Sequence, residues 1–207
     1  MKNILVTGGA GYIGSHTCLS LLKKNYNVFV VDSFINSSQK SLQKVREINN
    51  SIPENNNQLK VFKGDMTDIK FLEKVFLELL KNEIKIDGVI HFAGLKSVSE
   101  SVCNPLIYWN INLTATLNLL YIIKKYRCNN LVFSSSATIY APNDNKLLME
   151  DSEISPGNPY GNTKASIEKL LADVFHSSTQ EWKFASLRYF NPIGAHSSGL
   201  IGEDPRG

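Results

Sequence analysis

Four glycines within seven residues near the amino terminus restrict the fold of this chain more than any other feature. Gly8, Gly9, Gly11 and Gly14 directly follow a short apolar run and directly precede a helical pattern. At a turn from strand to helix, glycines allow a sharp change of direction, close approach of backbone N–H groups to a pyrophosphate, and tight packing of the helix on the strand. The spacing satisfies both G-x-G-x-x-G, from Gly9, and G-x-x-G-x-x-G, from Gly8, so it predicts a dinucleotide-binding α/β fold.

Six apolar runs separated by helical patterns predict the rest of this fold. Each run is continuous in apolar or β-branched residues, as expected for parallel strands that helices cover on both faces. Strands that alternate with helices in this way are typical of crossover units. The sequence therefore predicts an α/β fold with a doubly wound parallel sheet of the Rossmann type. The expected strands are residues 3–6, 27–31, 58–63, 87–92, 130–135 and 182–188.

Two of the expected helices carry more apolar surface than one sheet face can bury. Residues 106–126 are apolar on nearly every side of the helix, and residues 167–175 form a second apolar helical pattern. Such helices pack on more than one partner. We expect the two to pair with those of a second copy in a four-helix seam, which would make the protein a homodimer. The polar stretches 49–57 and 141–159 are expected to be loops.

Composition and charge exclude several classes of protein. The 207 residues carry 22 Lys plus Arg against 19 Asp plus Glu, a net charge of +3, which gives no indication of a nucleic-acid partner. Hydrophobic residues at 43% are ordinary globular usage and exclude a wholly disordered chain. We recognise no signal peptide and expect no apolar stretch long enough to span a membrane.

The cysteines and histidines predict a cytoplasmic protein without metal. Cys18, Cys103 and Cys128 are far apart, odd in number and set within apolar patterns, so we expect reduced cysteines that serve in packing. The four histidines show no metal-ligand spacing.

Asp32 predicts which dinucleotide the chain binds. It ends the second expected strand, 21 residues after Gly11. A carboxylate at this place accepts hydrogen bonds from the ribose hydroxyls of NAD and repels the additional phosphate of NADP. Residues 32–38 contain no Arg or Lys that would attract that phosphate. NAD is therefore the expected cofactor.

Tyr160 and Lys164 form the strongest candidate pair for chemistry. They stand four residues apart at the start of a helical pattern, so they lie on one face of the helix. A nearby ammonium group favours the phenolate form of a tyrosine, which could then act as a base. Ser134, Ser135 and Ser136 end the fifth expected strand, at the carboxyl edge where sheets of this type bind ligands. Their hydroxyls can hydrogen-bond a substrate, or they can simply cap the strand.

Five blocks of sequence together resemble one known family. The blocks are residues 7–16, 91–96, 133–138, Tyr160 with Lys164, and residues 188–192, which read TGGAGYIGSH, HFAGLK, FSSSAT, Y-x-x-x-K and RYFNP. In this order the sequence resembles the UDP-glucose 4-epimerases of the extended short-chain dehydrogenase/reductase family. Two positions depart from the family pattern. Ala115 replaces the glycine of the N-x-x-G-T motif that begins at Asn112, and Ala141 replaces a glycine that usually follows the tyrosine at that point.

The resemblance implies a set of site residues. Catalysis would involve Ser136, Tyr160 and Lys164, and the sugar nucleotide would contact Lys96, Ser136, Tyr160 and Asn191. The residues implied in NAD binding are Gly8, Gly11, Tyr12, Ile13, Gly14, Asp32, Asn36, Ser37, Asp65, Met66, Phe92, Ala93, Gly94, Lys96, Asn112, Ser134, Tyr160, Lys164, Tyr189 and Phe190.

The resemblance also implies an activity. The enzyme would interconvert UDP-glucose and UDP-galactose by transient hydride transfer to tightly bound NAD, through a 4-keto sugar. Residues 1–190 would form the NAD-binding domain, and residues 191–207 would begin a smaller substrate-binding domain that is largely missing. Which UDP-hexose is the substrate is left open by this sequence.

Two alternatives stay open, one a related enzyme and one a protein without catalytic activity. A nucleotide-sugar 4,6-dehydratase would share the glycine turn, Tyr160 and Lys164, but such enzymes resemble this chain less because they carry an acidic pair where it has Ala137-Thr138. A non-catalytic NAD-binding fragment is the second alternative, since the chain stops inside the expected substrate-binding loop.

Overall fold

A computed structural model describes residues 1–51, 57–141, 147–178 and 181–204 of the chain. Six parallel strands form one sheet in the order β3-β2-β1-β4-β5-β6, which confirms the predicted doubly wound Rossmann arrangement. The strands are β1 (Asn3–Thr7), β2 (Asn27–Asp32), β3 (Leu59–Lys63), β4 (Gly88–His91), β5 (Asn130–Ser134) and β6 (Lys183–Leu187). Each boundary differs from the predicted one by at most one residue.

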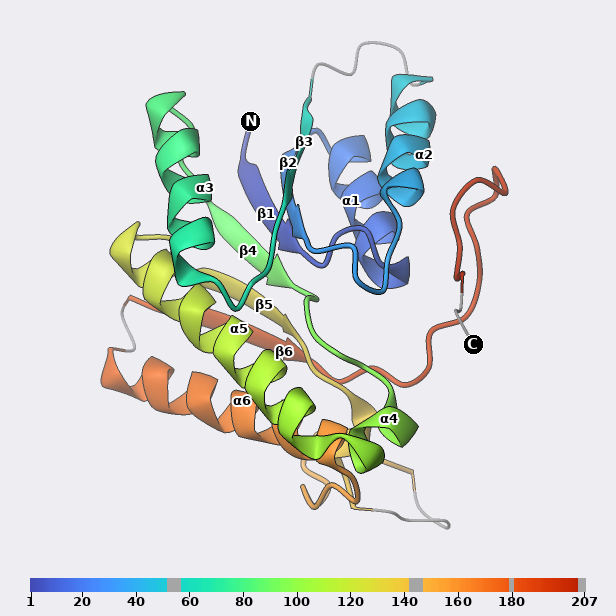
Figure 1. The fold of residues 1–207 in the computed structure, drawn as a ribbon, viewed down its shortest axis with the longest axis vertical. Helices are drawn as coiled ribbons and strands as arrows, with labels where there is room; N and C mark the ends of the chain where they lie inside the picture. The colour runs from blue at the N-terminus through green and yellow to red at the C-terminus, as the bar shows by residue number, and fades with distance from the viewer. Residues whose placement is uncertain (52–56, 142–146, 179–180, 205–207) are drawn as a thin grey trace.

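Helices cover both faces of the sheet (Figure 1). Helices α1 (Tyr12–Lys23) and α2 (Gln39–Asn50) lie together on one face. On the other face lie α3 (Ile69–Lys81), α5 (Pro105–Lys125) and α6 (Pro159–Ser177), with α5 packed between α3 and α6. The short helix α4 (Val98–Cys103) and a single 3₁₀ turn, η1 (Ala137–Ile139), lie beyond the carboxyl ends of the strands.

The alternation of side chains along each strand builds two separate cores. Leu5 and Phe29 face α3, α5 and α6, whereas their neighbours Val6 and Val30 face α1 and α2. All four side chains are completely buried. The continuous apolar strands that the sequence shows are therefore needed because both faces of the sheet are covered.

The carboxyl ends of β1 and β4 mark the place where the chain reverses its direction of winding. Thr7 and His91 pair at these ends, and the next strands run outward from β1 to β2 and from β4 to β5. In sheets of this topology, ligands bind in the crevice at that switch point. The glycine turn follows directly after β1, so the fold places it at this crevice.

Residues 191–204 turn back across the carboxyl edge towards α1 (Figure 1). The Tyr12 hydroxyl donates a hydrogen bond to the Gly194 carbonyl at 2.5 Å. Ile201 is buried in the core formed with α1 and α2. This segment therefore lies beside the glycine turn.

Three local predictions are corrected by the structure. Helix α2 continues to Asn50, so Asn49 and Asn50 are helical and not part of a loop; most of the predicted loop after them lies outside the described residues. Cys103 is exposed at the end of α4, so only Cys18 and Cys128 serve in packing. Helix α5 is long and apolar enough to span a membrane by length and composition, contrary to prediction, and 44% of its apolar window is buried inside this domain.

Candidate active site

The glycine turn leaves an open space at the beginning of α1. A Cβ atom at Gly8, whose φ is +68°, would lie 2.7 Å from the Ala93 nitrogen, so this position is closed by packing. At Gly11 a Cβ atom would meet only the Gly8 carbonyl oxygen, at 3.4 Å. Gly11 caps α1 without a side-chain hydrogen bond, which leaves the first N–H groups of the helix available to an anion. The geometry fits a pyrophosphate beside Gly11.

Asp32 is held beside this turn. It is 6% exposed, and its Oδ2 accepts a hydrogen bond from the Ala10 backbone at 2.9 Å. Its Oδ1 accepts from the Ser37 hydroxyl at 2.8 Å and from the Phe34 backbone at 2.9 Å. Each carboxylate oxygen has two lone pairs, so this arrangement orients Asp32 and still leaves it able to accept from a ribose hydroxyl. Asn36, the next candidate, is exposed beside it.

The other cofactor candidates follow the carboxyl ends of β3 and β4. Asp65 is exposed and accepts a hydrogen bond from the Thr67 backbone at 2.8 Å, whereas Met66 is buried. Phe92, Ala93 and Gly94 are partly buried beside the glycine turn, close to Gly8. The structure thus brings the ends of β1, β2, β3 and β4 to a common edge, as the parallel topology requires.

Asn112 holds the segment after β4 in place through hydrogen bonds. Its amide exchanges two hydrogen bonds with the Leu95 backbone, at 2.8 and 3.1 Å, and donates a third to the Thr163 hydroxyl at 3.1 Å. It is 2% exposed. A Cβ atom at Gly94 would lie 2.9 Å from its Oδ1, so this position requires a glycine. Lys96, two residues further, is exposed, with its ammonium 3.9 Å from the Glu203 carboxylate.

The three catalytic candidates meet where β5 ends. Tyr160 and Lys164 are buried on one face of α6, and Lys164 Nζ donates a hydrogen bond to the Ser134 carbonyl at 2.7 Å. The nearby Ser136 side chain lowers the phenol pKa of Tyr160, but burial has the larger, opposite effect, so this pKa lies above its usual value. Burial lowers the pKa of Lys164 to about 8.

The residues after β6 separate into buried and exposed candidates. Burial raises the pKa of Tyr189, and the nearby Ser134 side chain partly opposes that shift. Within the described part of the chain, the Tyr189 hydroxyl oxygen is buried without a hydrogen-bond partner of good geometry. Phe190 is 64% exposed and Asn191 is exposed. The structure therefore brings Tyr189 to the three candidates but leaves Phe190 and Asn191 facing outward.

A buried histidine, to which the sequence motifs gave no role, lies near this site. His91 hydrogen-bonds through Nδ1 to the Thr7 hydroxyl at 2.6 Å and through Nε2 to the Thr116 hydroxyl at 3.1 Å. Thr116 already donates its proton to the Asn112 carbonyl, so it accepts from His91, and Nε2 is the protonated nitrogen. Burial and the nearby Lys164 charge lower the pKa of His91 to about 3.

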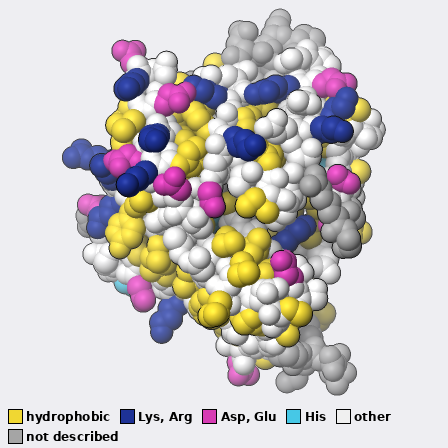
Figure 2. Space-filling view, viewed as in Figure 1, with side chains coloured by type: hydrophobic (Ala, Val, Ile, Leu, Met, Phe, Trp, Pro, Cys, Tyr) yellow, Lys and Arg dark blue, Asp and Glu magenta, His cyan; other side chains and the backbone are white. Residues whose placement is uncertain are grey.

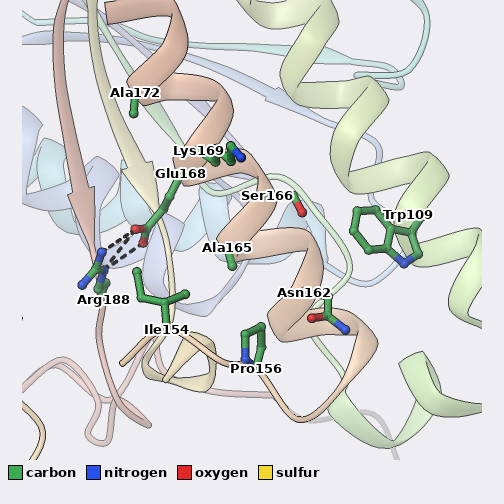
Figure 3. A pocket seen from close by; sticks show the side chains of 10 residues that line it. All are labelled: Trp109, Ile154, Pro156, Asn162, Ala165, Ser166, Glu168, Lys169, Ala172 and Arg188. Atoms are coloured by element: carbon green, nitrogen blue, oxygen red, sulfur yellow. Dashed lines mark hydrogen bonds and ion pairs between the residues drawn. The ribbon is translucent and has the colours of Figure 1, made fainter. Parts of the chain in front are cut away.

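A groove runs along the surface of α6 (Figure 3). It has a volume of about 550 Å³ and is lined by Trp109 of α5 together with α6 side chains that include Ala165 and Ala172. Tyr160 and Lys164 are not among its lining residues. In the described part of the chain, no three His, Cys, Asp or Glu side chains gather as metal ligands would.

Comparison with known protein families agrees with this geometry. A family model described as GDP-mannose 4,6 dehydratase matches residues 5–204. The chain belongs to this family of extended short-chain dehydrogenases/reductases. The predicted family is therefore confirmed.

Individual relatives carry a more specific name. UDP-glucose 4-epimerase 2 of Arabidopsis thaliana is 53% identical over 206 residues, which is 100% of this chain and 56% of that protein. UDP-glucose 4-epimerase of Bacillus subtilis is 48% identical over 204 residues, 99% of this chain and 57% of that protein. The structure of UDP-glucose 4-epimerase from Bifidobacterium longum, in complex with NAD+ and UDP, matches with a TM-score of 0.89 at 44% identity, covering 100% of this chain and 58% of that chain. This chain thus spans little more than half the length of these relatives.

Proposed function

We propose that this chain is the cofactor-binding and catalytic part of an NAD-dependent UDP-glucose 4-epimerase. The observation that carries the proposal is the meeting of Tyr160, Ser136 and Lys164 at the carboxyl end of β5, on the sheet whose glycine turn is open at Gly11. The names of the relatives support this choice of reaction. Residues 1–190 are proposed as the NAD-binding domain, and residues 191–207 as the beginning of the substrate-binding part.

The proposed cofactor site uses the residues at the switch point. The pyrophosphate would lie against Gly11 and the first turn of α1, and Asp32 would accept the adenosine ribose hydroxyls. The carboxyl ends of β3 and β4 would border the adenine and the nicotinamide ribose, with Lys164 reaching that ribose from α6. Bound NAD would supply hydride transfer to and from sugar C4, by way of a 4-keto sugar.

The side chains of the chain would handle the proton. Tyr160 as phenolate would take the proton of the sugar 4-hydroxyl, and Ser136 would hydrogen-bond to the same oxygen. Because burial raises the phenol pKa, Tyr160 needs added positive charge before it can act as a base near neutral pH. Lys164, held on the Ser134 carbonyl, is the cation of this chain placed to provide part of that charge.

A 4,6-dehydratase is the less favoured alternative, although the matching family model carries that description. Dehydration of a sugar needs acid and base groups besides the tyrosine. In this chain Ala137 and Thr138 follow Ser136, and neither can act as an acid or base. The carboxylate that contacts this serine segment, Glu168, is held in an ion pair by Arg188.

We further propose that two copies associate through α5 and α6. Leu106, Ile107 and Tyr121 of α5 are 82%, 50% and 65% exposed. Hydrophobic side chains gather over the lower half of the face in Figure 2, where α5 lies in Figure 1. The groove along α6 is lined partly by the small side chains Ala165, Ser166 and Ala172, with Trp109 of α5 beside them. Among the described side chains of α6 the large apolar ones are at least partly buried, so α5 would contribute most of the contact.

Cytoplasmic localisation stays a prediction.

Cofactor binding and turnover are tested separately. Titration calorimetry of the 207-residue chain with NAD and with NADP should detect NAD binding and a preference for NAD. Interconversion of UDP-glucose and UDP-galactose should then be measured for this chain alone and for a protein of the relatives' full length that contains it. We expect turnover in the longer protein and negligible turnover in the isolated chain, because positioning of the sugar contributes several kcal/mol to such reactions.

Three outcomes would count against the proposal. A folded 207-residue chain that does not bind NAD would remove the cofactor site. A longer protein that binds NAD without epimerising would leave a non-catalytic NAD-binding module, and release of a 4-keto-6-deoxy sugar would favour the dehydratase.

A further inference from the structure

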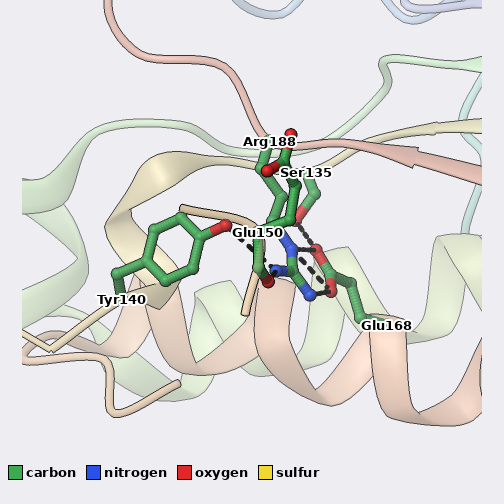
Figure 4. Close-up of polar contacts among 5 residues, drawn as sticks. All are labelled: Ser135, Tyr140, Glu150, Glu168 and Arg188. Carbon is green, nitrogen blue, oxygen red and sulfur yellow. Dashed lines mark hydrogen bonds and ion pairs between the residues drawn. The ribbon is translucent and has the colours of Figure 1, made fainter. Parts of the chain in front are cut away.

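Glu168 and Arg188 form an ion pair next to Ser135 (Figure 4), the neighbour of the catalytic candidate Ser136. Arg188 Nη2 is 2.7 Å from Glu168 Oε2, and Arg188 Nε donates to both carboxylate oxygens at 3.1 Å. The side chains are only 21% and 11% exposed. A buried ion pair of this kind loses solvation and contributes little net stability to the fold. Stability alone therefore does not explain why the pair lies at this position.

Arg188 joins several segments that are distant in sequence. Its Nη1 donates hydrogen bonds to the Tyr140 hydroxyl at 3.0 Å and to the Glu150 carbonyl at 2.7 Å. The guanidinium also lies over the Tyr140 ring, 5.3 Å from its centroid. The hydrogen bonds raise the Arg188 pKa, so the group stays charged. Arg188 therefore ties the end of β6 to α6 and to two points, Tyr140 and Glu150, of the connection between η1 and α6.

The ion pair reaches the catalytic serine through its neighbours. The Ser135 hydroxyl donates a hydrogen bond to Glu168 Oε1. On the other side of Ser136, the Ala137 N–H donates to the carbonyl of Tyr189 at 3.0 Å. Ser136 is thus fixed from both sides, once by the ion pair itself and once by the residue next to Arg188.

The backbone conformation couples these two anchors to Ser136, whose hydroxyl also accepts hydrogen bonds from the Thr138 N–H at 3.2 Å and the Thr138 hydroxyl at 3.0 Å. Its φ and ψ are −156° and 148°, which is extended backbone. Neighbouring side chains of an extended segment point in opposite directions, so a rotation of Ser135 away from Glu168 would turn Ser136 with it. A shift of this kind would remove the Ser136 hydroxyl from the Tyr160 phenol.

We infer that Glu168 and Arg188 are a positioning pair, which holds Ser135 and thereby aims the Ser136 hydroxyl at Tyr160. Neither residue touches substrate or cofactor in this inference. The pair is neutral as a whole, so it orients the site without adding net charge beside the phenol. Its part in catalysis rests on the proposed function, but its effect on Tyr160 does not.

The titration of Tyr160 reports the proposed effect directly. The 207-residue chain contains eight tyrosines, and labelling with 3-fluorotyrosine gives each phenol its own fluorine NMR signal. The fluorine also lowers every phenol pKa, which brings the titration to a milder pH. The Tyr160→Phe variant identifies the signal of Tyr160. We expect Glu168→Ala to raise the Tyr160 pKa by roughly one unit, because the displaced Ser136 hydroxyl no longer stabilises the phenolate.

Two further variants separate positioning from folding. Ser135→Ala removes only the hydroxyl that contacts Glu168 and leaves the ion pair, so it should raise the pKa in the same direction even if Glu168→Ala fails to fold. Glu168→Gln retains an oxygen that can accept from Ser135, and should restore most of the original value. Glu78→Ala breaks an exposed ion pair with Lys60 between α3 and β3 and is the matched control, with no expected change.

Unchanged titration of Tyr160 in folded Ser135→Ala and Glu168→Ala would overturn the inference, whatever their stability. NAD affinity should stay within about threefold in these variants, since they lie away from the glycine turn. Failure of all variants and of the parent chain to bind NAD would count against the proposed function and not against the positioning pair. In a longer, active protein, Ser135→Ala should lower kcat about tenfold with KM nearly unchanged.

Discussion

The ammonium group of Lys164 lies 5.7 Å from the ring centroid of Tyr160, one helical turn along α6. It also lies 4.8 Å from the Phe133 ring and donates to the Ser134 carbonyl. Burial shifts both groups towards their uncharged forms, since it raises the phenol pKa and lowers the ammonium pKa to about 8. Lys164 therefore remains charged at pH 7, whereas Tyr160 stays neutral until further positive charge enters the site.

Tyr160→Phe tests the proposed base. In a protein of the relatives' length that contains this chain, the substitution should lower turnover by on the order of 100-fold, the size of a general-base contribution. NAD binding should persist, because the ring is retained. Steady-state kinetics and calorimetry measure the two effects. Tyr26→Phe, at the opposite edge of the sheet before β2, is the control and should leave turnover unchanged. Near-normal turnover in Tyr160→Phe would exclude this residue as the base.

Asp32→Ala tests the choice of cofactor. The carboxylate is oriented by Ala10, Phe34 and Ser37, so its removal takes away the acceptor for the ribose hydroxyls and the charge that repels a phosphate. We expect NAD binding to weaken by at least on the order of tenfold and the preference over NADP to shrink. Ser37→Ala removes one donor to Asp32 and should keep the preference. Equal affinity of the unmodified chain for NAD and NADP in calorimetry would refute the assignment.

The sequence contained enough information to predict the sheet but not the contacts below the site. The four central strands contain continuous apolar runs bounded by polar or glycine residues, so their limits are visible locally, whereas the edge strands β3 and β6 include Lys60 and Ser186. The link between His91 and Thr7 joins residues 84 positions apart, and it depends on the pairing of β1 with β4. A single sequence does not give that register.

Helical spacing alone places Glu168 beside the two catalytic candidates of α6. It stands four residues after Lys164 and eight after Tyr160, so all three lie along one face of the helix. Helical spacing therefore indicates, from the sequence alone, that the Glu168 carboxylate lies on the same side of the helix as the two catalytic candidates. The partner of Glu168, Arg188, follows another element, so helical spacing does not predict their contact. The short helix α4 has too few residues for a clear helical period, so it too could not be predicted from the sequence.

His91 predicts a loss of stability in acid. The unfolded histidine binds a proton near pH 6.5, whereas the folded one resists protonation down to about pH 3. Between these values the unfolded state holds the extra proton, so the free energy of unfolding falls as the pH falls. From pH 7 to pH 4.5 this contributes about 3 kcal/mol.

Urea denaturation of the chain and of His91→Gln over this pH range measures that contribution. The variant should lose distinctly less stability than the parent between pH 7 and 4.5. His176→Gln, which changes an exposed histidine near the end of α6, should follow the parent curve. Parallel curves for His91→Gln and the parent would contradict the prediction.

The exposed face of α5 predicts association. Sedimentation velocity at micromolar concentration should show a dimer, and Leu106→Glu should shift it to monomer because a charge would be buried in the seam. Leu147→Glu changes another exposed leucine outside α5 and should leave the dimer intact. A folded parent chain that is entirely monomeric at this concentration would exclude the proposed seam.

Lys164 predicts that function and stability oppose each other in this site. Its folded pKa of about 8 lies below the model-peptide value of 10.5, so burial of the charged form destabilises the fold at neutral pH by about 3 kcal/mol. Between pH 8 and 10.5 the unfolded state binds the proton that the folded state has lost, and the free energy of unfolding should therefore rise with pH.

Lys164→Met retains most of the apolar stem and removes the charge. Loss of the hydrogen bond to the Ser134 carbonyl offsets part of the gain, by about 1–2 kcal/mol. We expect the variant to be more stable than the parent at pH 7 by on the order of 1 kcal/mol, and its stability to lack the rise between pH 8 and 10.5. NAD should bind more weakly, since the variant has no ammonium to offer the ribose. Urea denaturation at pH 7 and pH 10, with calorimetry at pH 7, measures all three effects, and a variant that is both less stable at pH 7 and unchanged in NAD affinity would contradict the argument.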